Sequence, residues 1–377
     1  MPPPSRFAGW PPIFARLALL ALSLLLLASA VVPTARPANI EGGVDLYARG
    51  AAQKARAQGN QDIALYRVAT ARIAGGENYY DFIVAEQRRF EYPLRPGYAV
   101  RLPTLAYISA WLGEGGLIAA ALALMLAVIA AWWVKLGDQP ETKRWRALAT
   151  AAVAVGMSLA TNRAFFPLHE LWAGGLLALS FGIHRKGHWV AAFLAAALAL
   201  AIRELALPFV LLMGAFALWH RNWREAAAWS GLVVLFALGM AVHLHLIARD
   251  VLSTDMPSAP WLVLRGLSGW LANVVQSSNL RWLPHFIAGP LVVLACFGWL
   301  GWNGREGLFG FLLAAGYGAA FMIASRWDNY YWGAMIAPAM LAGIVFAPRA
   351  LSGLVLAADP DRKLIARGGA VMQKRPE

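Results

Sequence analysis

Cysteine and charge are both scarce in this sequence. The single cysteine, Cys296, lies in an apolar run, which excludes an intrachain disulfide and a cysteine-based metal cluster. Only 14% of the 377 residues are charged, whereas a typical soluble domain carries about a quarter. There is no HExxH motif and no cysteine pair, so the sequence indicates neither a metal ion nor another cofactor. Helix-turn-helix, zinc-finger and RNA-binding signatures are also missing, and the net charge of +13 therefore does not indicate a nucleic-acid partner.

Apolar residues, by contrast, make up 59% of the chain. They come in runs of about 20 residues, the length that crosses the hydrocarbon core of a lipid bilayer. We therefore predict an all-α polytopic membrane protein with about ten transmembrane helices in a single membrane domain, residues 1–346. The predicted spans are residues 13–32, 117–134, 147–161, 168–183, 189–202, 205–219, 225–247, 284–302, 307–324 and 330–346. Ala28-Ser29-Ala30, near the end of the first span, resembles a signal-peptidase site. Residues 13–32 are nevertheless long enough to cross a bilayer, so we interpret them as an uncleaved signal anchor in preference to a cleaved signal peptide.

The predicted first loop, residues 33–115, is long and carries juxtamembrane helices. The apolar stretch 103–112 covers only about half of a bilayer core at ~1.5 Å per residue, so we interpret it as a re-entrant or interfacial helix that ends at Gly113. With that assignment, the basic residues of the short loops gather on one side: Lys143, Arg144, Arg146, Arg185, Lys186, Arg221, Arg224 and Arg305, joined by the basic tail 347–377. The positive-inside rule then places both termini in the cytoplasm and the first loop outside.

Residues 62–105 hold the candidate catalytic groups. Apolar positions recur at helical spacing over residues 63–73, and Gly75-Gly76 ends the predicted helix. Asp62 lies four residues before Tyr66, so both belong to one helix face. A carboxylate at the mouth of an apolar cavity is a candidate general base, although Asp is also a common helix N-cap. Asp45 is a second candidate base of the same form.

Polar residues also mark the predicted outer ends of several spans. A charged group near membrane depth is costly and usually lines a cavity or a pathway. The candidate substrate-binding residues are Tyr66, Tyr79, Tyr80, Arg101, His169, Glu170, Arg203, Glu204, Arg326, Asp328 and Asn329. An arginine presents a planar fork that suits phosphate, and we favour Arg203 for that role. The alternatives are an interfacial salt bridge for Arg203–Glu204 and an aromatic belt for the tyrosines. His243 and His245 are two residues apart, which argues against a shared metal ion on a helix.

The order of these features resembles the GT-C superfamily of integral-membrane glycosyltransferases. The resemblance consists of one span, an external loop with an acidic-x-x-Leu-Tyr helix, a Gly-Gly-x-x-Tyr-Tyr turn, a proline-rich stretch, Arg-Leu-Pro-Thr-Leu and a series of further spans. It implies a polyprenyl-phosphate sugar as donor, and an acidic catalytic base in the first loop that maps to Asp62. The chain lacks the second acidic residue of the larger members at the loop start, which leaves Asp45 as a rival.

The resemblance therefore implies an inverting sugar transfer to an unknown acceptor, at the outer face of a bacterial inner membrane. Two other classes are compatible with the composition. A transporter or lipid flippase would carry charges deep in its spans and broken helices at paired positions, and only Arg203-Glu204 is close to that description. A non-catalytic membrane protein of envelope assembly would keep the architecture with a degenerate site.

Overall fold

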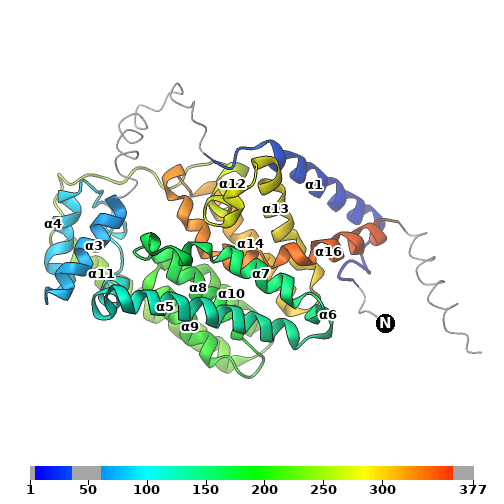
Figure 1. The fold of residues 1–377 in the computed structure, drawn as a ribbon, viewed down its shortest axis with the longest axis horizontal. Helices are drawn as coiled ribbons and strands as arrows, with labels where there is room; N and C mark the ends of the chain where they lie inside the picture. The colour runs from blue at the N-terminus through cyan, green and yellow to red at the C-terminus, as the bar shows by residue number, and fades with distance from the viewer. Residues whose placement is uncertain (1–4, 36–60, 360–377) are drawn as a thin grey trace, which may run out of the picture.

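Helices form all the regular secondary structure of residues 5–35 and 61–359, the part of the chain that the computed structural model describes (Figure 1). The α-helices are α1 (Pro12–Val31), α3 (Gln61–Ala74), α4 (Tyr79–Arg89), α5 (Thr104–Gly137), α6 (Pro140–Lys143), α7 (Arg146–Gly156), α8 (His169–Ile183), α9 (Val190–Ile202), α10 (Leu207–Trp219), α11 (Trp223–Ala248), α12 (Leu267–Gln276), α13 (His285–Gly298), α14 (Arg305–Ile323), α15 (Ala337–Met340) and α16 (Gly343–Ala358). The 3-10 helices are η1 (Gly97–Ala99), η2 (Ser158–Thr161), η3 (Arg163–Phe165), η4 (Glu204–Ala206), η5 (Asn279–Trp282), η6 (Trp299–Gly301) and η7 (Trp327–Met335).

Within residues 5–35 and 61–359, four helical segments are long and apolar enough to cross a membrane: Pro12–Val31, Gly97–Gly137, Trp223–Ala248 and Arg305–Ile323. Five further apolar segments are shorter: Arg146–Gly156, Val190–Ile202, Glu204–Trp219, His285–Gly301 and Gly343–Ala358. A helix of 13 residues rises only about 20 Å, less than the ~30 Å of a bilayer core. The all-helical membrane class of the chain is thus supported, while the figure of ten full spans stays a prediction.

The C-terminal helices differ from the expectation. The segment predicted as the last span, residues 330–346, is divided among η7, α15 and the first turn of α16. Pro338 near the start of α15 lacks the N–H that a continuous helix would need at that point. The long final helix is instead α16, which continues to Ala358 and buries Ala350 and Leu354. The sequence analysis also did not predict the helices α4 and α12.

Helix α5 contains the break expected at Gly113. This residue has φ +65° and ψ −178°, a conformation that glycine adopts without a Cβ clash. The predicted short helix 103–112 and the predicted span 117–134 are therefore two arms of one kinked helix. The outer arm carries Trp111, whose side chain is almost fully exposed.

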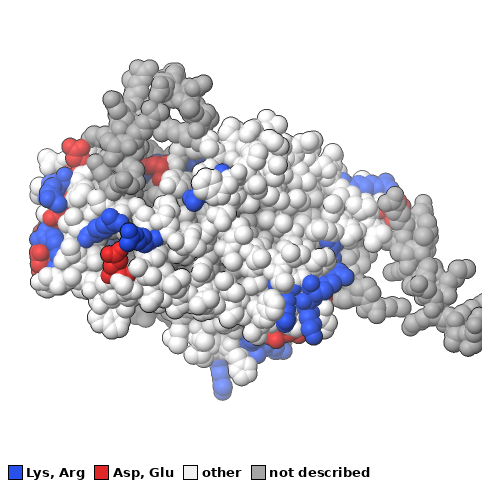
Figure 2. Space-filling model, in the orientation of Figure 1, with Lys and Arg blue, Asp and Glu red and all other residues white. Residues whose placement is uncertain are grey.

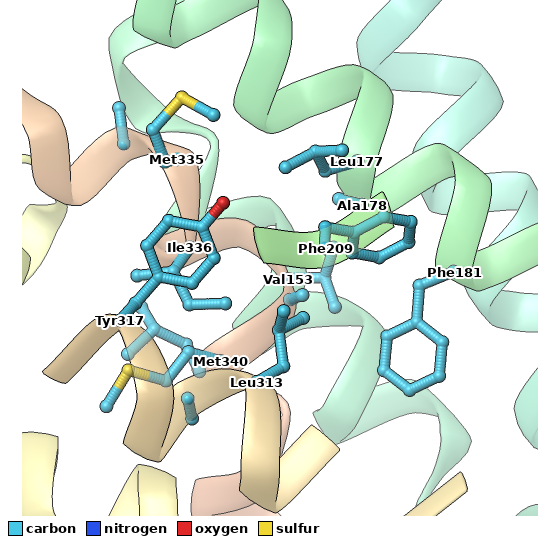
Figure 3. Close-up of a cluster of buried hydrophobic side chains, with 14 of the residues drawn as sticks. Val153, Leu177, Ala178, Phe181, Phe209, Leu313, Tyr317, Met335, Ile336 and Met340 are labelled. Atoms are coloured by element: carbon cyan, nitrogen blue, oxygen red, sulfur yellow. The ribbon is translucent and has the colours of Figure 1, made fainter. Parts of the chain in front are cut away.

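Helix α8 lies at the centre of the bundle, and nearly all of its residues are buried. Side chains of α7, α8, α10 and α14 meet there, among them Val153, Phe181, Phe209 and Leu313 (Figure 3). In lipid, such packing depends on small residues that let helices approach closely. Gly174 of α8 is one of them, because a Cβ at this position would lie 2.0 Å from the carbonyl oxygen of Ala334. This close approach presses η7 against α8.

The predicted cytoplasmic loops meet at one end of the bundle. Four pairs join them: Trp302 Nε1 donates to Gln139 Oε1 at 2.7 Å, Arg349 contacts Glu141 at 2.9 Å, Arg185 contacts Asp138 at 3.1 Å, and His184 Nε2 lies 2.8 Å from Glu225 Oε1. Helices α3 and α4 lie at the opposite end (Figure 1). On the face shown in Figure 2, charged side chains gather toward these two ends, and most of the surface between them is uncharged.

Two segments far apart in sequence form one unit at the α3–α4 end. Arg88 of α4 holds Asp255 through two bonds of 2.6 and 2.8 Å, and Arg95 Nε donates to the Asp255 carbonyl oxygen at 2.8 Å. The backbone N–H of Leu252 donates to the Asp255 carboxylate at 2.7 Å. These bonds fasten the chain after α11 to α4 and to the segment that leads to Arg101.

We expect this attachment to weaken in acid. The Arg88 guanidinium and the Leu252 N–H stabilise the Asp255 carboxylate and lower its pKa from 3.8 to about 2. Because the folded pKa lies below the unfolded one, the stabilisation is complete above about pH 4 and is lost as the pH falls toward 2. In Asp255→Asn, hydrogen exchange at neutral pH should accelerate at the amides of Leu252 and Ser258. Unchanged exchange at both amides would contradict the assigned role of Asp255.

Candidate functional site

Several of the predicted polar residues lie where helices begin or end, at the α3–α4 end of the bundle. His169 and Glu170 form the first turn of α8. Arg203 ends α9 with an extended backbone, φ −146° and ψ 120°, and Glu204 begins η4 directly after it. Arg101 follows η1 shortly before α5. Three separate helix ends thus carry the charged groups.

Arg203 is enclosed by two carboxylates. Its side chain is 1% exposed, and Nε donates to Glu170 Oε1 at 2.7 Å. A second guanidinium nitrogen contacts the Glu204 carboxylate. The guanidinium also lies 5.9 Å from the ring centroid of Trp332 in η7. With its charge balanced in this way, Arg203 is suited to hold α8, α9 and η4 together more than to bind a phosphate.

Arg101 is the second arginine of the site, and fewer carboxylates lie close to its guanidinium than to that of Arg203. Arg101 Nε donates to Tyr66 Oη on α3 at 3.2 Å, and its carbonyl oxygen accepts from Tyr79 Oη at 2.8 Å. No carboxylate among residues 5–35 and 63–359 lies within 4 Å of its guanidinium. Glu170 and Glu204 are close enough to attract it through space. Arg101 therefore couples the first loop to the Arg203 cluster.

Two buried ring nitrogens at the site make no hydrogen bond with any residue in the described part of the chain. His169 is 4% exposed, and its ring lies edge-on to that of Tyr66 with centroids 4.9 Å apart. The carbonyl groups of Leu102 and Pro167 lie near this ring, but Nδ1 has no hydrogen-bond partner. Trp332 Nε1 is also buried without a partner. Because unsatisfied buried polar groups cost free energy, both nitrogens suit contact with water or with a ligand oxygen.

His243 is a neighbour of the site that the sequence-based list of substrate-binding residues did not include. It is 2% exposed in α11. Its Nδ1 lies 3.1 Å from Tyr80 Oη, and its Nε2 lies 3.2 Å from the Val100 carbonyl oxygen. In the sequence, the feature that could have indicated His243 is its position within an apolar helix, at the end near the polar cluster. His243 thus positions Tyr80 and the backbone directly before Arg101.

The remaining predicted residues are not brought into this cluster by a direct contact. Arg326 pairs with Asp328 at 3.2 Å, and its carbonyl oxygen accepts from Arg265 at 3.1 Å. Asn329 is buried and accepts from Tyr331 Oη at 3.5 Å. These three residues form a separate group at η7.

The two candidate bases differ in how far the structure describes them. Asp62 lies in the first turn of α3, while its side chain falls outside the described part. Asp45 lies outside the described residues altogether. A cavity of about 520 Å³ borders α3 at Ile63, Ala64 and Arg67. Tyr66, on the same helix, contacts His169 and Arg101, so the cavity and the polar cluster share α3.

Within the described ranges, no three His, Cys, Asp or Glu side chains are grouped closely enough to hold a metal ion. Comparisons with family models, with curated proteins and with solved structures found no match for this chain.

Proposed function

We propose that this protein is a membrane glycosyltransferase that moves a sugar from a polyprenyl-phosphate donor to an acceptor hydroxyl. One observation carries the proposal: Arg101 and His169 both contact Tyr66 of the helix that contains Asp62, and Trp332 lies beside the neighbouring Arg203. A guanidinium and two unpartnered ring nitrogens together favour a ligand with a negatively charged oxygen. A phosphate between a lipid and a sugar is such a ligand.

The reaction requires a base and a stabilised leaving group. In the proposed reaction, a carboxylate takes the proton from the acceptor hydroxyl, whose oxygen then bonds to the anomeric carbon of the sugar. The bond between that carbon and the phosphate oxygen breaks, and polyprenyl phosphate leaves with the electron pair. The configuration at the anomeric carbon is inverted by this single displacement. Asp62 is the proposed base, with Asp45 as the alternative.

Arg101 is the proposed ligand of the leaving phosphate. Its charge-assisted hydrogen bonds would strengthen as negative charge develops on the phosphate oxygen. Arg203, first favoured for this role, is instead a positioning residue, because Glu170 and Glu204 occupy its guanidinium. His243 supports Arg101 through the Val100 carbonyl oxygen.

The proposed location is the inner membrane of a bacterium, with the site on its outer face and both termini in the cytoplasm. The support is the meeting of the basic loops at the end opposite α3 and α4, since Lys and Arg are enriched on the cytoplasmic side of membrane proteins. At the outer face a nucleotide sugar is scarce, which favours a lipid-linked donor.

Sugar transfer from radiolabelled polyprenyl-phosphate sugars by the purified protein in lipid vesicles tests the proposal. We expect Arg101→Ala to lower kcat/KM for the donor roughly 10²-fold, the usual loss for removing one group that stabilises transition-state charge. The matched control is Arg144→Ala, which removes an exposed arginine between α6 and α7, at the opposite end of the bundle. Equal rates for the two variants would refute the assignment of Arg101. Passage of the lipid-linked sugar across the membrane without transfer would favour the flippase alternative.

A further inference from the structure

The chain between α11 and α12 contains an extended segment, residues 261–265, that runs alongside the C-terminal end of α14. Val263 pairs with Ala324 as a parallel bridge, and the backbone N–H groups of Arg265 and Gly266 donate to the Met322 carbonyl oxygen at 2.9 and 3.0 Å. This segment is therefore fixed against the last turn of a helix that is long and apolar enough to span a membrane.

Alternate residues of an extended segment point to opposite sides. Here Val263 and Arg265 are half-buried, whereas Leu262 and Leu264 are 79% and 82% exposed. Few large apolar side chains in the described part are as exposed as these two. Ile323, at the end of α14, is itself 52% exposed, so the two leucines extend an apolar surface that already belongs to a candidate span.

One arginine–tryptophan pair lies at the end of this segment, and a second pair lies in η5, after α12. The Arg265 guanidinium stacks over Trp327 at 3.7 Å from the ring centroid, and Arg281 lies over Trp282 at 4.9 Å. Trp282 is 74% exposed. Tryptophan and snorkelling arginine are the residues that occupy the boundary between lipid headgroups and acyl chains.

We propose that Leu262 and Leu264 form a wedge that inserts into the lipid leaflet at the α3–α4 end of the protein. Lipid is the occupant that continuity with α14 favours, because the same apolar surface passes from a candidate span onto the segment. Extended backbone is not tolerated deep in the hydrocarbon core, and the segment therefore lies at the headgroup–acyl boundary. The wedge is independent of the proposed enzymatic activity.

Spin labels attached to introduced cysteines test this proposal. The protein carries Cys296→Ser as background and one of three further changes, Leu262→Cys, Leu264→Cys or Thr254→Cys, in vesicles of phosphatidylcholine and phosphatidylglycerol. Thr254 is an exposed residue of the same connection and serves as the matched control. Oxygen partitions into lipid, whereas nickel ethylenediaminediacetate stays in water. We expect the ratio of oxygen to nickel accessibility to be several-fold higher at 262 and 264 than at 254.

Two results would overturn the wedge. Nickel accessibility at 262 and 264 equal to that at 254 would place the leucines in water. Low accessibility to both reagents would mean that protein, such as a second copy of this chain, covers them. If Cys296→Ser reduces the yield of folded protein, the same labels in the native background give the comparison, because the Cys296 side chain is 5% exposed.

Discussion

Asp62→Asn should abolish sugar transfer, lowering kcat by about 10²- to 10⁴-fold, the contribution usual for a general base. Asparagine has nearly the same shape but cannot accept the proton of the acceptor hydroxyl. The loss should fall on kcat more than on KM for the donor, because the base acts on the acceptor in the transition state. Initial rates with purified variants in vesicles, measured over a range of donor concentrations, give both constants.

The control for Asp62→Asn is Glu114→Gln, which neutralises an exposed carboxylate paired with Arg163. Asp45→Asn separates the two candidate bases, because only one of the two changes should have the full effect. An Asp62→Asn protein that transfers sugar at the rate of the unchanged protein would remove Asp62 from the mechanism. Full activity of both variants would reject the carboxylate-base mechanism altogether.

Arg203→Met should lower the free energy of unfolding more than any other substitution proposed for this protein. The substitution leaves the buried carboxylate of Glu170 without its partner, and breaking a buried ion pair from one side costs about 3–5 kcal/mol. For a chain of 377 residues, we expect the unfolding midpoint to fall by roughly 4–6 °C. Cys296 offers a direct measurement, since its thiol is buried in the native bundle and reacts with a fluorogenic dye only on unfolding.

Two further variants test whether the unpaired Glu170 carboxylate causes the loss of stability. Arg163→Met removes an exposed arginine, 76% accessible and paired with Glu114, and should shift the midpoint little. The double variant Arg203→Met, Glu170→Met removes both charges and should be more stable than Arg203→Met alone. A double variant less stable than either single one would show that packing, and not the unpaired carboxylate, explains the loss.

The sequence predicted those features that follow from local patterns. Apolar periodicity and Gly75-Gly76 correctly indicated the helix that became α3. The length of residues 103–112 indicated a break in what is now α5, and Gly113 supplies it. The distribution of Lys and Arg indicated which loops share one end, because the rule depends on composition alone. That assignment in turn predicted that Asp62, His169, Arg203 and Arg326 would border one cavity. The structure joins Arg203 to Glu170 and Glu204, whereas Arg326 pairs separately with Asp328.

Features that depend on tertiary contacts were not predictable. Sequence spacing does not show that Glu170 pairs with Arg203, 33 residues away, so the sequence alone leaves Arg203 as a candidate phosphate ligand. Helix α4 combines apolar residues that pack on α3 with a charged outer face, and its low mean hydropathy concealed it. The break of residues 330–346 also follows from tertiary packing, since η7 and Ala334 lie against Gly174 of α8.

For the proposed sugar transfer, the link between Arg88 and Asp255 restricts how an acceptor could reach the site. Because the link ties α4 to the chain after α11, neither segment can swing aside by itself. Entry from that side would require α4 and the chain after α11 to move together. In the proposed reaction, an acceptor that enters from that side would thus arrive at the speed of this joint movement, whatever the rate of the chemical step.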